Sequence, residues 1–290
     1  PCPNPHNQQR HSLLIRALMS KLVEDRYMTR LVVTALGERN TDYLIYQAFV
    51  TFENMDPLWT IDLSNPTSPT IMGELKVPGV STYIHPLSDD AILTIGLGPA
   101  DEETGLGLDW GNTRLSLFNV SNFSDPQETQ TLSLSPVEDP TDGWTWAWSE
   151  ATWEHKAFQY WAPKGMLAVP LNTYRYDYYY DDDGRYHYDY DWVSKLIIVN
   201  VTEEGLEIHG EVDHSHLYET EENYWWSSYN IRRSIFMGDF IYSFSALGAS
   251  VHKVDDMSVQ VELNLPGHQM NNYYIFLQDP IFYLQTYKMI

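Results

Sequence analysis

The chain has 290 residues, of which 40 are acidic and 17 are basic, so its formal net charge at pH 7 is −23. This charge opposes binding to nucleic acid or to an anionic membrane surface, and we expect neither as a partner. The single cysteine excludes an internal disulfide, and the sequence contains no run of about 18 apolar residues that would predict a transmembrane helix.

Three regions follow from the distribution of charge and apolar residues. Residues 1–36 are Pro-rich and then basic, and residues 12–23 within them are compatible with a helix. We expect this atypical N-terminal segment to carry no strand of the main fold. Residues 37–267 hold a repeated pattern of short apolar runs, and residues 268–290 form an atypical C-terminal tail with abrupt aromatic clusters.

The repeated pattern is an apolar run that ends in Asp or Asn, followed by one apolar residue and a polar turn. Its copies are residues 58–66, 115–122, 196–202 and, more faintly, 251–257. The markers Asp62, Asn119, Asn200 and Asp255 lie 57, 81 and 55 residues apart, so the third unit carries an insertion. A period near 40 to 50 residues with several strands per unit is typical of a β-propeller.

Each unit resolves into four short strands separated by Pro, Gly, Asn and Asp turns. The apolar run of the pattern is the third strand of its unit. The strands expected before it are residues 81–85 and 91–96, 155–160 and 166–171, and 234–237 and 240–244. The strands expected after it are residues 71–77, 129–134, 206–212 and 259–265. The first unit shows only its last three strands, between residues 48 and 77.

We therefore predict an all-β fold, namely a β-propeller of four-stranded blades, with about four blades or part of a larger ring. Each marker Asp or Asn is expected to accept a hydrogen bond from the backbone two residues further on, which is a structural role. The apolar residues of the pattern are expected to be buried between blades: Trp59, Ile61, Leu117, Val199 and Val201.

A resemblance to a known family rests on particular stretches of this region. The most specific are residues 49–52, 56–66, 73–79, 83–86 and 155–158. In these stretches the chain resembles a family of secreted bacterial and archaeal proteins with a C-terminal β-propeller that is distantly related to WD repeats. The resemblance implies a propeller fold and a secreted or cell-envelope location. It names no activity and transfers no catalytic residues.

Tyrosine and tryptophan are concentrated in three segments next to the expected blades. In a propeller, the connections that enter a blade lie on a rim of the ring, where exposed aromatic rings stack on sugars or anchor a protein partner. The candidate partner-binding residues are Trp144, Trp146, Trp148, Tyr186, Tyr188, Tyr224, Trp225 and Trp226. The alternative is that the tryptophans simply cover the side of a blade.

The insertion in the third unit, residues 174–192, allows two interpretations. Asp181 and Asp183 beside Gly184 are the residue types that bind calcium, although the spacing of an EF-hand loop is not met. Alternation of Tyr with Asp fits instead a long hairpin with aromatic residues on one face and charge on the other.

Four histidines fall near the starts of expected innermost strands, namely His85, His155, His214 and His216, and the first three are the candidate metal ligands. If they converge at the channel of the ring, their imidazoles and a neighbouring carboxylate would suit a transition metal. The alternative for each is a hydrogen-bonded structural role.

Catalytic signatures are absent from the sequence, which lacks a nucleophile elbow, an HExxH motif and a phosphate-binding glycine loop. We therefore predict an extracytoplasmic scaffold, not an enzyme, that binds a protein or carbohydrate partner through aromatic rim loops. The alternative is a metal-binding protein or hydrolase with a site of histidines and carboxylates at the channel mouth. We expect no cofactor. If the candidate ligands bind a metal ion, that ion would be calcium or a transition metal.

Overall fold

The computed structural model describes most of the repeat region and leaves the two ends of the chain out. The described residues are 28–36, 43–50, 55–62, 64–65, 68–135, 144–181, 183–217 and 230–265. Within them lie four antiparallel sheets, three of four strands and one of five. No helix of the described residues is long and apolar enough to cross a membrane.

Each sheet is built from strands that follow one another along the chain. The first sheet holds β1 (Met28–Leu36), β2 (Tyr43–Val50), β3 (Met55–Asp62) and β4 (Thr70–Pro78). The second holds β5 (Val80–Pro86), β6 (Ala91–Leu97), β7 (Thr113–Asn119) and β8 (Gln127–Ser133). The third holds β10 (Gln159–Trp161), β11 (Met166–Tyr180), β12 (Tyr186–Val201) and β13 (Leu206–Asp213), with β9 (Trp144–Trp148) paired to β11. The fourth holds β14 (Arg233–Met237), β15 (Phe240–Phe244), β16 (Gly248–Lys253) and β17 (Val259–Asn264).

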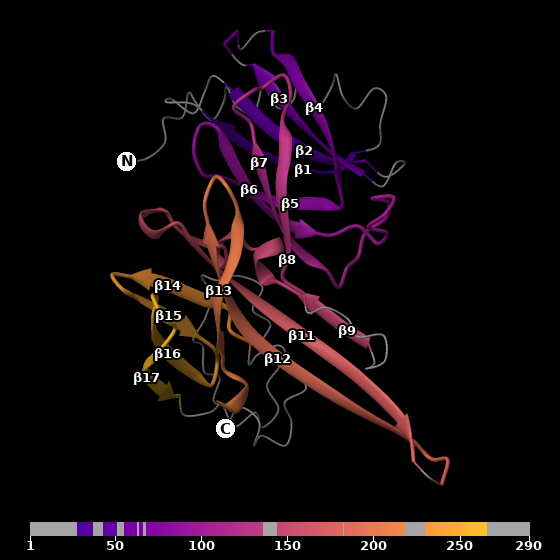
Figure 1. The fold of residues 1–290 in the computed structure, drawn as a ribbon, viewed down its shortest axis with the longest axis vertical. Coiled ribbons are helices and arrows are strands. Elements are labelled where there is room, and N and C mark those ends of the chain that lie inside the picture. The colour runs from indigo at the N-terminus through magenta and orange to yellow at the C-terminus, as the bar shows by residue number, and fades with distance from the viewer. Residues whose placement is uncertain are drawn as a thin grey trace, which may run out of the picture.

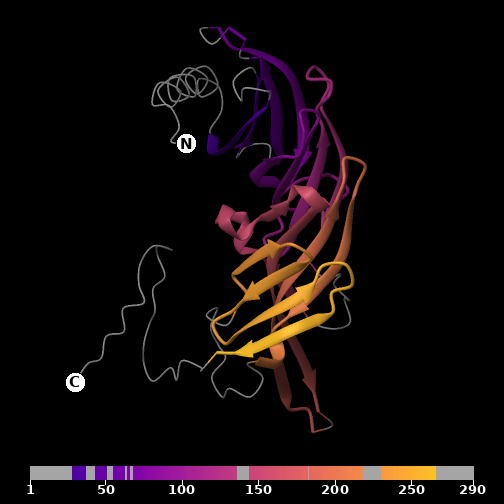
Figure 2. The same ribbon diagram turned by 90° about the vertical axis from the view of Figure 1, so that its left-hand side faces the viewer.

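The four sheets follow one another along an arc in chain order, with the first and fourth sheets at its ends (Figures 1 and 2). The short 3-10 helices η1 (Glu150–Thr152) and η2 (His155–Ala157) connect β9 to β10. The all-β prediction and its four-stranded repeat are confirmed.

Apolar side chains fill the seams between neighbouring sheets. We call the face of a sheet that meets the preceding sheet its leading face, and the opposite one its trailing face. The first seam contains Leu58, Val77, Ile84, Ile92, Phe118 and Val120. The second seam contains Leu93, Ile95, Leu115, Leu117, Leu167, Val169, Ile197 and Val199, among others. The third seam contains Met166, Ala168, Leu196, Ile198, Val212, Ile231, Ile241 and Val254.

A strand that is covered on both faces has a nearly continuous apolar sequence. Strand β6 is such a strand, and all seven of its residues are buried. The pattern residues predicted to be buried, listed above from Trp59 to Val201, are all at most 5% exposed, so their burial is confirmed. Leu117, Val199 and Val201 lie at the second seam, as predicted for residues between blades. Trp59 and Ile61 alternate with Leu58 along β3 and lie on the face of the first sheet that points away from the first seam.

Every sheet carries a β-bulge at the same place, between its third and fourth strands. The register shifts at Thr60/Ile61, Leu117/Phe118, Ile198/Val199 and Val251/His252. In the first three sheets the residue after the bulge is the marker Asp or Asn. The bulge recurs in every sheet, so it is a regular part of the four-stranded unit. A bulge bends the strand that carries it, and here that strand is the outer one.

The same alignment corrects the fourth marker. The Val254 amide donates to the Asp239 carbonyl at 2.8 Å. The equivalent amides in the second and third sheets, those of Val120 and Val201, donate to the carbonyls of Asp90 and Gly165, each at 2.7 Å. Lys253 therefore occupies the marker position, and the choice of Asp255 was wrong by two residues. Adjacent acidic residues made the sequence pattern ambiguous there.

The predicted turn role of the markers is confirmed at two of them. Asp62 Oδ1 accepts a hydrogen bond from the Ser64 amide at 2.8 Å, and Asn119 Oδ1 accepts one from the Ser121 amide at 2.9 Å. The hydrogen bonds from Ser64 lower the pKa of Asp62. The Asn200 side chain instead approaches Nδ1 of His209 at 3.5 Å.

Two strand boundaries were wrong. Residues 28–36, assigned above to a segment without strands, form β1, which pairs along its length with β2 and completes the first sheet. Its Val and Thr residues favour a strand, although neighbouring arginines mask the pattern. The strand expected over residues 155–160 begins only at Gln159, because Glu154 caps the Lys156 amide at 3.0 Å and initiates η2. The expected helix over residues 12–23 and the tail over residues 268–290 lie outside the described residues.

Candidate functional site

The most prominent feature of the surface is the hairpin formed by β11 and β12, which extends well beyond the body of the third sheet (Figure 1). The register pairs Tyr174 with Trp192 and, at the far end, Tyr180 with Tyr186. Strand β9 pairs with the near half of β11 and places Trp146 opposite Tyr174. We call this three-stranded unit, residues 144–148, 174–180 and 186–192, the aromatic ribbon.

Aromatic positions share one face of the ribbon. Side chains alternate between the faces of a strand, and directly paired positions lie on the same face. The register therefore assigns to one face the positions of Trp144, Trp146, Trp148, Tyr174, Tyr176, Tyr178, Tyr180, Tyr186, Tyr188, Tyr190 and Trp192. The positions of Arg175, Asp177, Asp189 and Asp191 belong to the opposite face. The strand register confirms the predicted hairpin and places the aromatic and the charged positions on opposite faces.

The base of the ribbon is held by ring packing. The Trp148 and Trp192 rings meet edge to face, with centroids 4.9 Å apart and an interplanar angle of 72°. Tyr174 contacts Trp192 at 6.1 Å, and the indole Nε1 of Trp192 donates to Oδ1 of Asn230 at 3.0 Å. These contacts fix the ribbon against the start of the fourth sheet.

Exposure increases from the base of the ribbon to its tip. Trp148, Tyr174 and Trp192 are half-buried at the base, whereas Tyr180 is 66% and Tyr186 is 47% exposed. These two tip rings meet at 5.5 Å. The aromatic face is therefore anchored at one end and open to solvent at the other.

The turn at the tip is organised by one carboxylate. Asp181 Oδ1 accepts hydrogen bonds from the amides of Arg185 (2.8 Å) and Asp183 (3.0 Å), and Oδ2 lies 2.7 Å from Nε2 of His187. The bonds from His187 and Arg185 hold the pKa of Asp181 below its usual value. Both oxygens of Asp181 thus have partners within the turn, while Asp183 is exposed.

Two of the three candidate histidines come together. His85 and His155 both lie next to Tyr83, with ring centroids 6.1 and 6.5 Å from it. The Tyr83 hydroxyl is 3.3 Å from Nδ1 of His85, and burial lowers the pKa of this imidazole. Phe158 packs against His85 at 5.4 Å, so the pair belongs to an aromatic cluster at the second seam.

His214 lies apart from that pair, at the third seam. It is fully buried, and its Nδ1 and Nε2 are 3.0 and 2.8 Å from the hydroxyls of Ser245 and Ser250. Burial lowers its pKa to about 4, so the imidazole is neutral at pH 7. Among the described residues, no group of three His, Cys, Asp or Glu is arranged to hold a metal ion. A metal at these histidines or at Asp181 and Asp183 stays a prediction.

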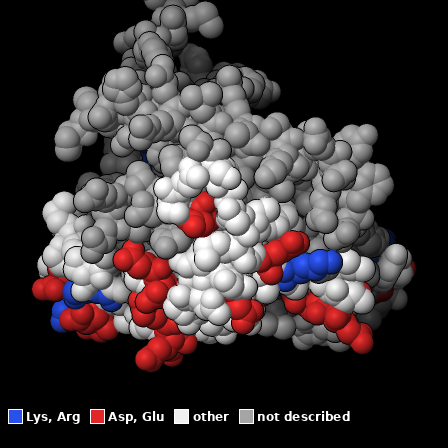
Figure 3. Space-filling model, turned by 90° about the horizontal axis from the view of Figure 1, so that it is seen from above, with Lys and Arg blue, Asp and Glu red and all other residues white. Residues whose placement is uncertain are grey.

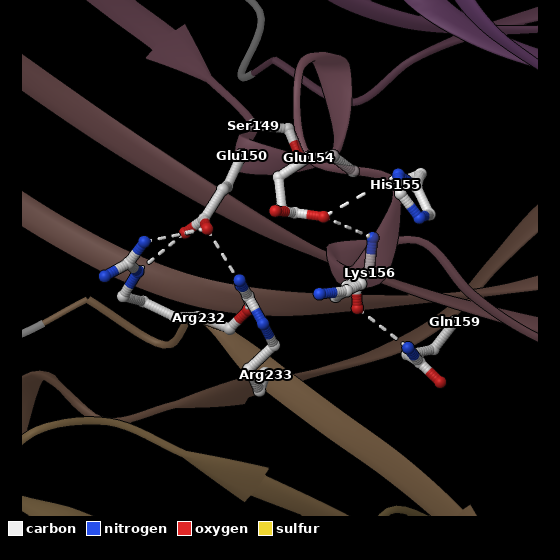
Figure 4. A network of polar contacts seen from close by, with 9 residues as sticks. Ser149, Glu150, Glu154, His155, Lys156, Gln159, Arg232 and Arg233 are labelled. Atoms are coloured by element: carbon white, nitrogen blue, oxygen red, sulfur yellow. Dashed lines mark hydrogen bonds and ion pairs between the residues drawn. The ribbon is translucent and has the colours of Figure 1, made fainter. Parts of the chain in front are cut away.

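An ion-pair network that the sequence analysis missed joins the third and fourth sheets (Figure 4). The carboxylate of Glu150 in η1 is largely buried. It accepts hydrogen bonds from Nε and Nη2 of Arg232 at 2.8 and 2.9 Å, and from Nη1 of Arg233 at 2.8 Å. Burial acts to raise the pKa of Glu150, but the hydrogen bonds from both arginines hold it below its usual value. The adjacent arginines were the only sequence signal, since their partner lies 82 residues away.

The remaining sequence candidates are only partly placed. Tyr224, Trp225 and Trp226 lie outside the described residues. The strand positions of Trp144 and Tyr188 are set by the register alone. Figure 3 shows the face of the molecule seen from above the first two sheets, where Asp and Glu outnumber Lys and Arg among the described residues.

Comparison with protein families agrees with this architecture. The model of the β-propeller domain family matches residues 39–257, which is more than half of the chain. The chain belongs to the β-propeller family. Such a domain indicates a scaffold for protein interactions, and propellers share a fold without sharing one function.

Two archaeal relatives are similar in sequence. An uncharacterized protein of Archaeoglobus fulgidus is 34% identical over 133 residues, which are 46% of this chain and 18% of the relative. An uncharacterized protein of Methanocaldococcus jannaschii is 27% identical over 212 residues, which are 73% of this chain and 25% of the relative. The chain thus spans a quarter or less of the length of these relatives.

Solved propellers show a faint likeness. The β-propeller domain of Cps50 (Swd1) from Myceliophteria thermophila aligns with 82% of this chain and 73% of its own, at 10% identity and a TM-score of 0.27. The WD40 domain of SCAP from fission yeast aligns with 84% of this chain and 57% of its own, at 9% identity and a TM-score of 0.26. Scores this low support no inference about what the chain binds.

Proposed function

We propose that this chain is an extracytoplasmic β-propeller scaffold that binds a protein or carbohydrate partner through the aromatic face of the ribbon. The observation that carries the proposal is the pairing of β9, β11 and β12, which brings three separate aromatic segments onto one face. Tyr and Trp bury a large area at a small cost in side-chain entropy, and their polar atoms still form hydrogen bonds at the edge of a contact.

The build of the ribbon suits recognition better than a purely structural role. A blade needs strands only as long as its neighbours, yet β11 has 15 residues and β12 has 16, while β10 has three. The additional length carries exposed rings away from the body of the sheet, where they contribute nothing to a seam. The net charge of −23 favours a neutral or basic partner over an anionic one.

The extracytoplasmic location is part of the proposal. It is supported by the stretches that resemble secreted propeller proteins, from residues 49–52 to residues 155–158. Fractionation of the native organism, followed by detection of the chain in the envelope and the medium, tests it directly.

Binding is tested with the purified chain against two defined probes, a set of neutral polysaccharides in affinity gels and a displayed peptide library. The double variant Tyr180→Ala, Tyr186→Ala removes the exposed tip rings of the aromatic face. We expect it to weaken binding at least tenfold, because exposed aromatic anchors each contribute about 1–2 kcal/mol at an interface.

Tyr179→Ala is the matched control, since Tyr179 is 59% exposed in the same turn of the hairpin but its position belongs to the opposite face. We expect this variant to bind as the unmodified chain does, with an unchanged melting temperature. Equal loss in both variants, or no loss in either, would contradict the proposed face.

A further inference from the structure

Three segments at or just after the end of a third strand have the sequence Asn-x-Ser or Asn-x-Thr, in which x is not Pro. They begin at Asn119, Asn122 and Asn200. This sequence is the acceptor for N-glycosylation in secreted proteins, where a sugar is attached to the amide nitrogen of the asparagine. So short a motif also occurs by chance, and the structure separates the three copies.

An acceptor has to present two groups at once. The amide Nδ2 of the asparagine forms the new bond to the sugar. The motif also requires a hydroxyl two residues later, and a transferase can bind that hydroxyl only if no other group of the protein occupies it. The hydrogen bonds of each copy therefore indicate whether it is available in the folded chain.

The copy at Asn122 has both groups free. Asn122 and Ser124 are exposed, and Oδ1 of Asn122 accepts a hydrogen bond from the Ser124 amide at 3.1 Å. Among the described residues, neither Nδ2 of Asn122 nor the hydroxyl of Ser124 makes a hydrogen bond. In the neighbouring copy the hydroxyl is occupied, because Ser121 Oγ donates to Oδ1 of Asn119 at 2.7 Å.

The copy at Asn200 has neither group free. Its asparagine is half-buried, and Nδ2 lies 3.5 Å from Nδ1 of His209. The Thr202 hydroxyl donates to the Gly205 carbonyl at 3.3 Å and accepts from the Gly205 amide at 3.1 Å. A glycan at this position would have to displace contacts within the third sheet.

The turn that carries Asn122 is held from the inside. Phe123, the middle residue of the motif, packs against the first seam, and its carbonyl accepts a hydrogen bond from the Thr60 hydroxyl. The Asn122 carbonyl accepts one from the Asp125 amide at 2.9 Å. The motif is thus anchored by its middle residue, while the residues on either side stay exposed, so a glycan displaces no contact there.

We propose that Asn122 is a glycosylation site that takes an N-linked glycan on the folded chain. Transfer forms a bond from Nδ2 to the anomeric carbon of the sugar and breaks the bond from that carbon to the phosphate of a polyprenyl-phosphate-linked donor. The lipid phosphate leaves, and Nδ2 loses one proton to a base of the transferase. This inference rests on the extracytoplasmic location in the proposed function.

The glycan would leave the aromatic ribbon open. Figure 1 shows the turn between β7 and β8 near one end of the long axis and the tip of the β11–β12 hairpin near the other. A sugar on Asn122 therefore does not cover the exposed rings of the ribbon, and the two proposals can be tested separately.

The test uses the full chain with an affinity tag, isolated from the envelope and medium of the native organism, digested with trypsin and analysed by mass spectrometry. We expect the tryptic peptide that follows Arg114 to carry the added mass of a glycan, located on Asn122 by fragmentation. Asn122→Gln and Ser124→Ala should each abolish the added mass. Ser124→Thr, which keeps a hydroxyl, and Asn119→Gln in the same turn should retain it.

The melting temperature of each variant separates loss of the acceptor from misfolding. An envelope or secreted chain in which Asn122 is unmodified overturns the inference and leaves the proposed location intact. Modification of Asn119 or Asn200 to the same extent as Asn122 overturns it as well, because the free groups would then decide nothing. A chain confined to the cytoplasm overturns the location and this inference together, whereas binding through the ribbon is measured on the purified chain.

Discussion

The second and fourth sheets have the same strands in the same order, yet they differ in what covers them. The second sheet is enclosed by neighbours on both faces, and β6 is buried along its whole length. Among the described residues, the fourth sheet is covered only on its leading face, and every residue of its outer strand β17 is exposed. Strands with similar sequence patterns therefore contribute unequally to the stability of the fold, because the burial of a strand depends on the neighbouring sheet and not on the strand itself.

The comparison also separates two kinds of contact. The second seam is held by apolar packing around residues such as Leu117 and by one polar bridge, in which the Gln130 side chain bonds the backbone of Leu206. The third seam adds polar contacts, with Glu150 and its arginines near one part and the buried His214 with its serines in another. The predictions below test these differences, beginning with the largest effect.

Leu117→Ala should destabilise the chain by about 3–5 kcal/mol, because a fully buried side chain is replaced by a cavity that neighbouring sheets cannot fill. Leu263→Ala, at a position that is 55% exposed, should cost less than about 1 kcal/mol in dilute solution. Urea unfolding of both variants measures the difference. Similar losses at the two positions would mean that the two sheets are covered alike.

Acid should weaken the third seam through His214. Burial, its largest cause, lowers the pKa of this group from 6.5 to about 4, and His216 and His252 act in the same direction, against Glu262 and Asp213. Between these pH values the unfolded chain binds a proton that the folded chain does not, so stability falls as pH drops from 6.5 to about 4 and does not change through this group above that window. The loss should reach about 2–3 kcal/mol.

The measurement is the free energy of unfolding of the unmodified chain and of His214→Gln between pH 4 and 8. The difference between them should shrink as pH falls through that window, because the variant has no imidazole to protonate. A constant difference across the range would show that His214 is not the titrating group.

Glu150→Gln should destabilise the chain by about 1–3 kcal/mol, because two arginine side chains lose the charge that they share. The effect stays moderate since both arginines are partly exposed. Glu154→Gln is the control, as it removes a neighbouring charge that caps η2 and lies 3.7 Å from Nδ1 of His155, and it should cost about 0.5–1 kcal/mol. Salt should reduce the first loss. A loss for Glu150→Gln no larger than that of the control would contradict a role in joining the sheets.

The smallest expected effect concerns the tip of the ribbon. Asp181 already has partners for both oxygens, so calcium should raise the melting temperature no more than sodium chloride at equal ionic strength. Thermal unfolding in the two salts decides the point. A calcium-specific rise that disappears in the Asp181→Asn, Asp183→Asn double variant would establish a metal site there.

Local patterns were sufficient for the fold. The repeated apolar run with its Asp or Asn predicted the third strand of each unit, because alternation and turn chemistry act over a few residues. The same locality explains two errors. At Asp255, adjacent carboxylates offered equivalent markers, and only the hydrogen bond of Val254 decides between them. At β1, a strand hidden among arginines is recognisable only by its partner β2.

The sequence by itself determined the class of fold, the unit of four strands, the burial of residues such as Trp59 and the alternating faces of the β11–β12 hairpin. Only the tertiary structure decided what lies beside what. It placed β9 against β11, separated His214 from His85, and joined Glu150 to arginines 82 residues further on. Turns and alternation are set by neighbours in the chain, whereas a seam, an ion pair or an uncovered face depends on which segments meet in space.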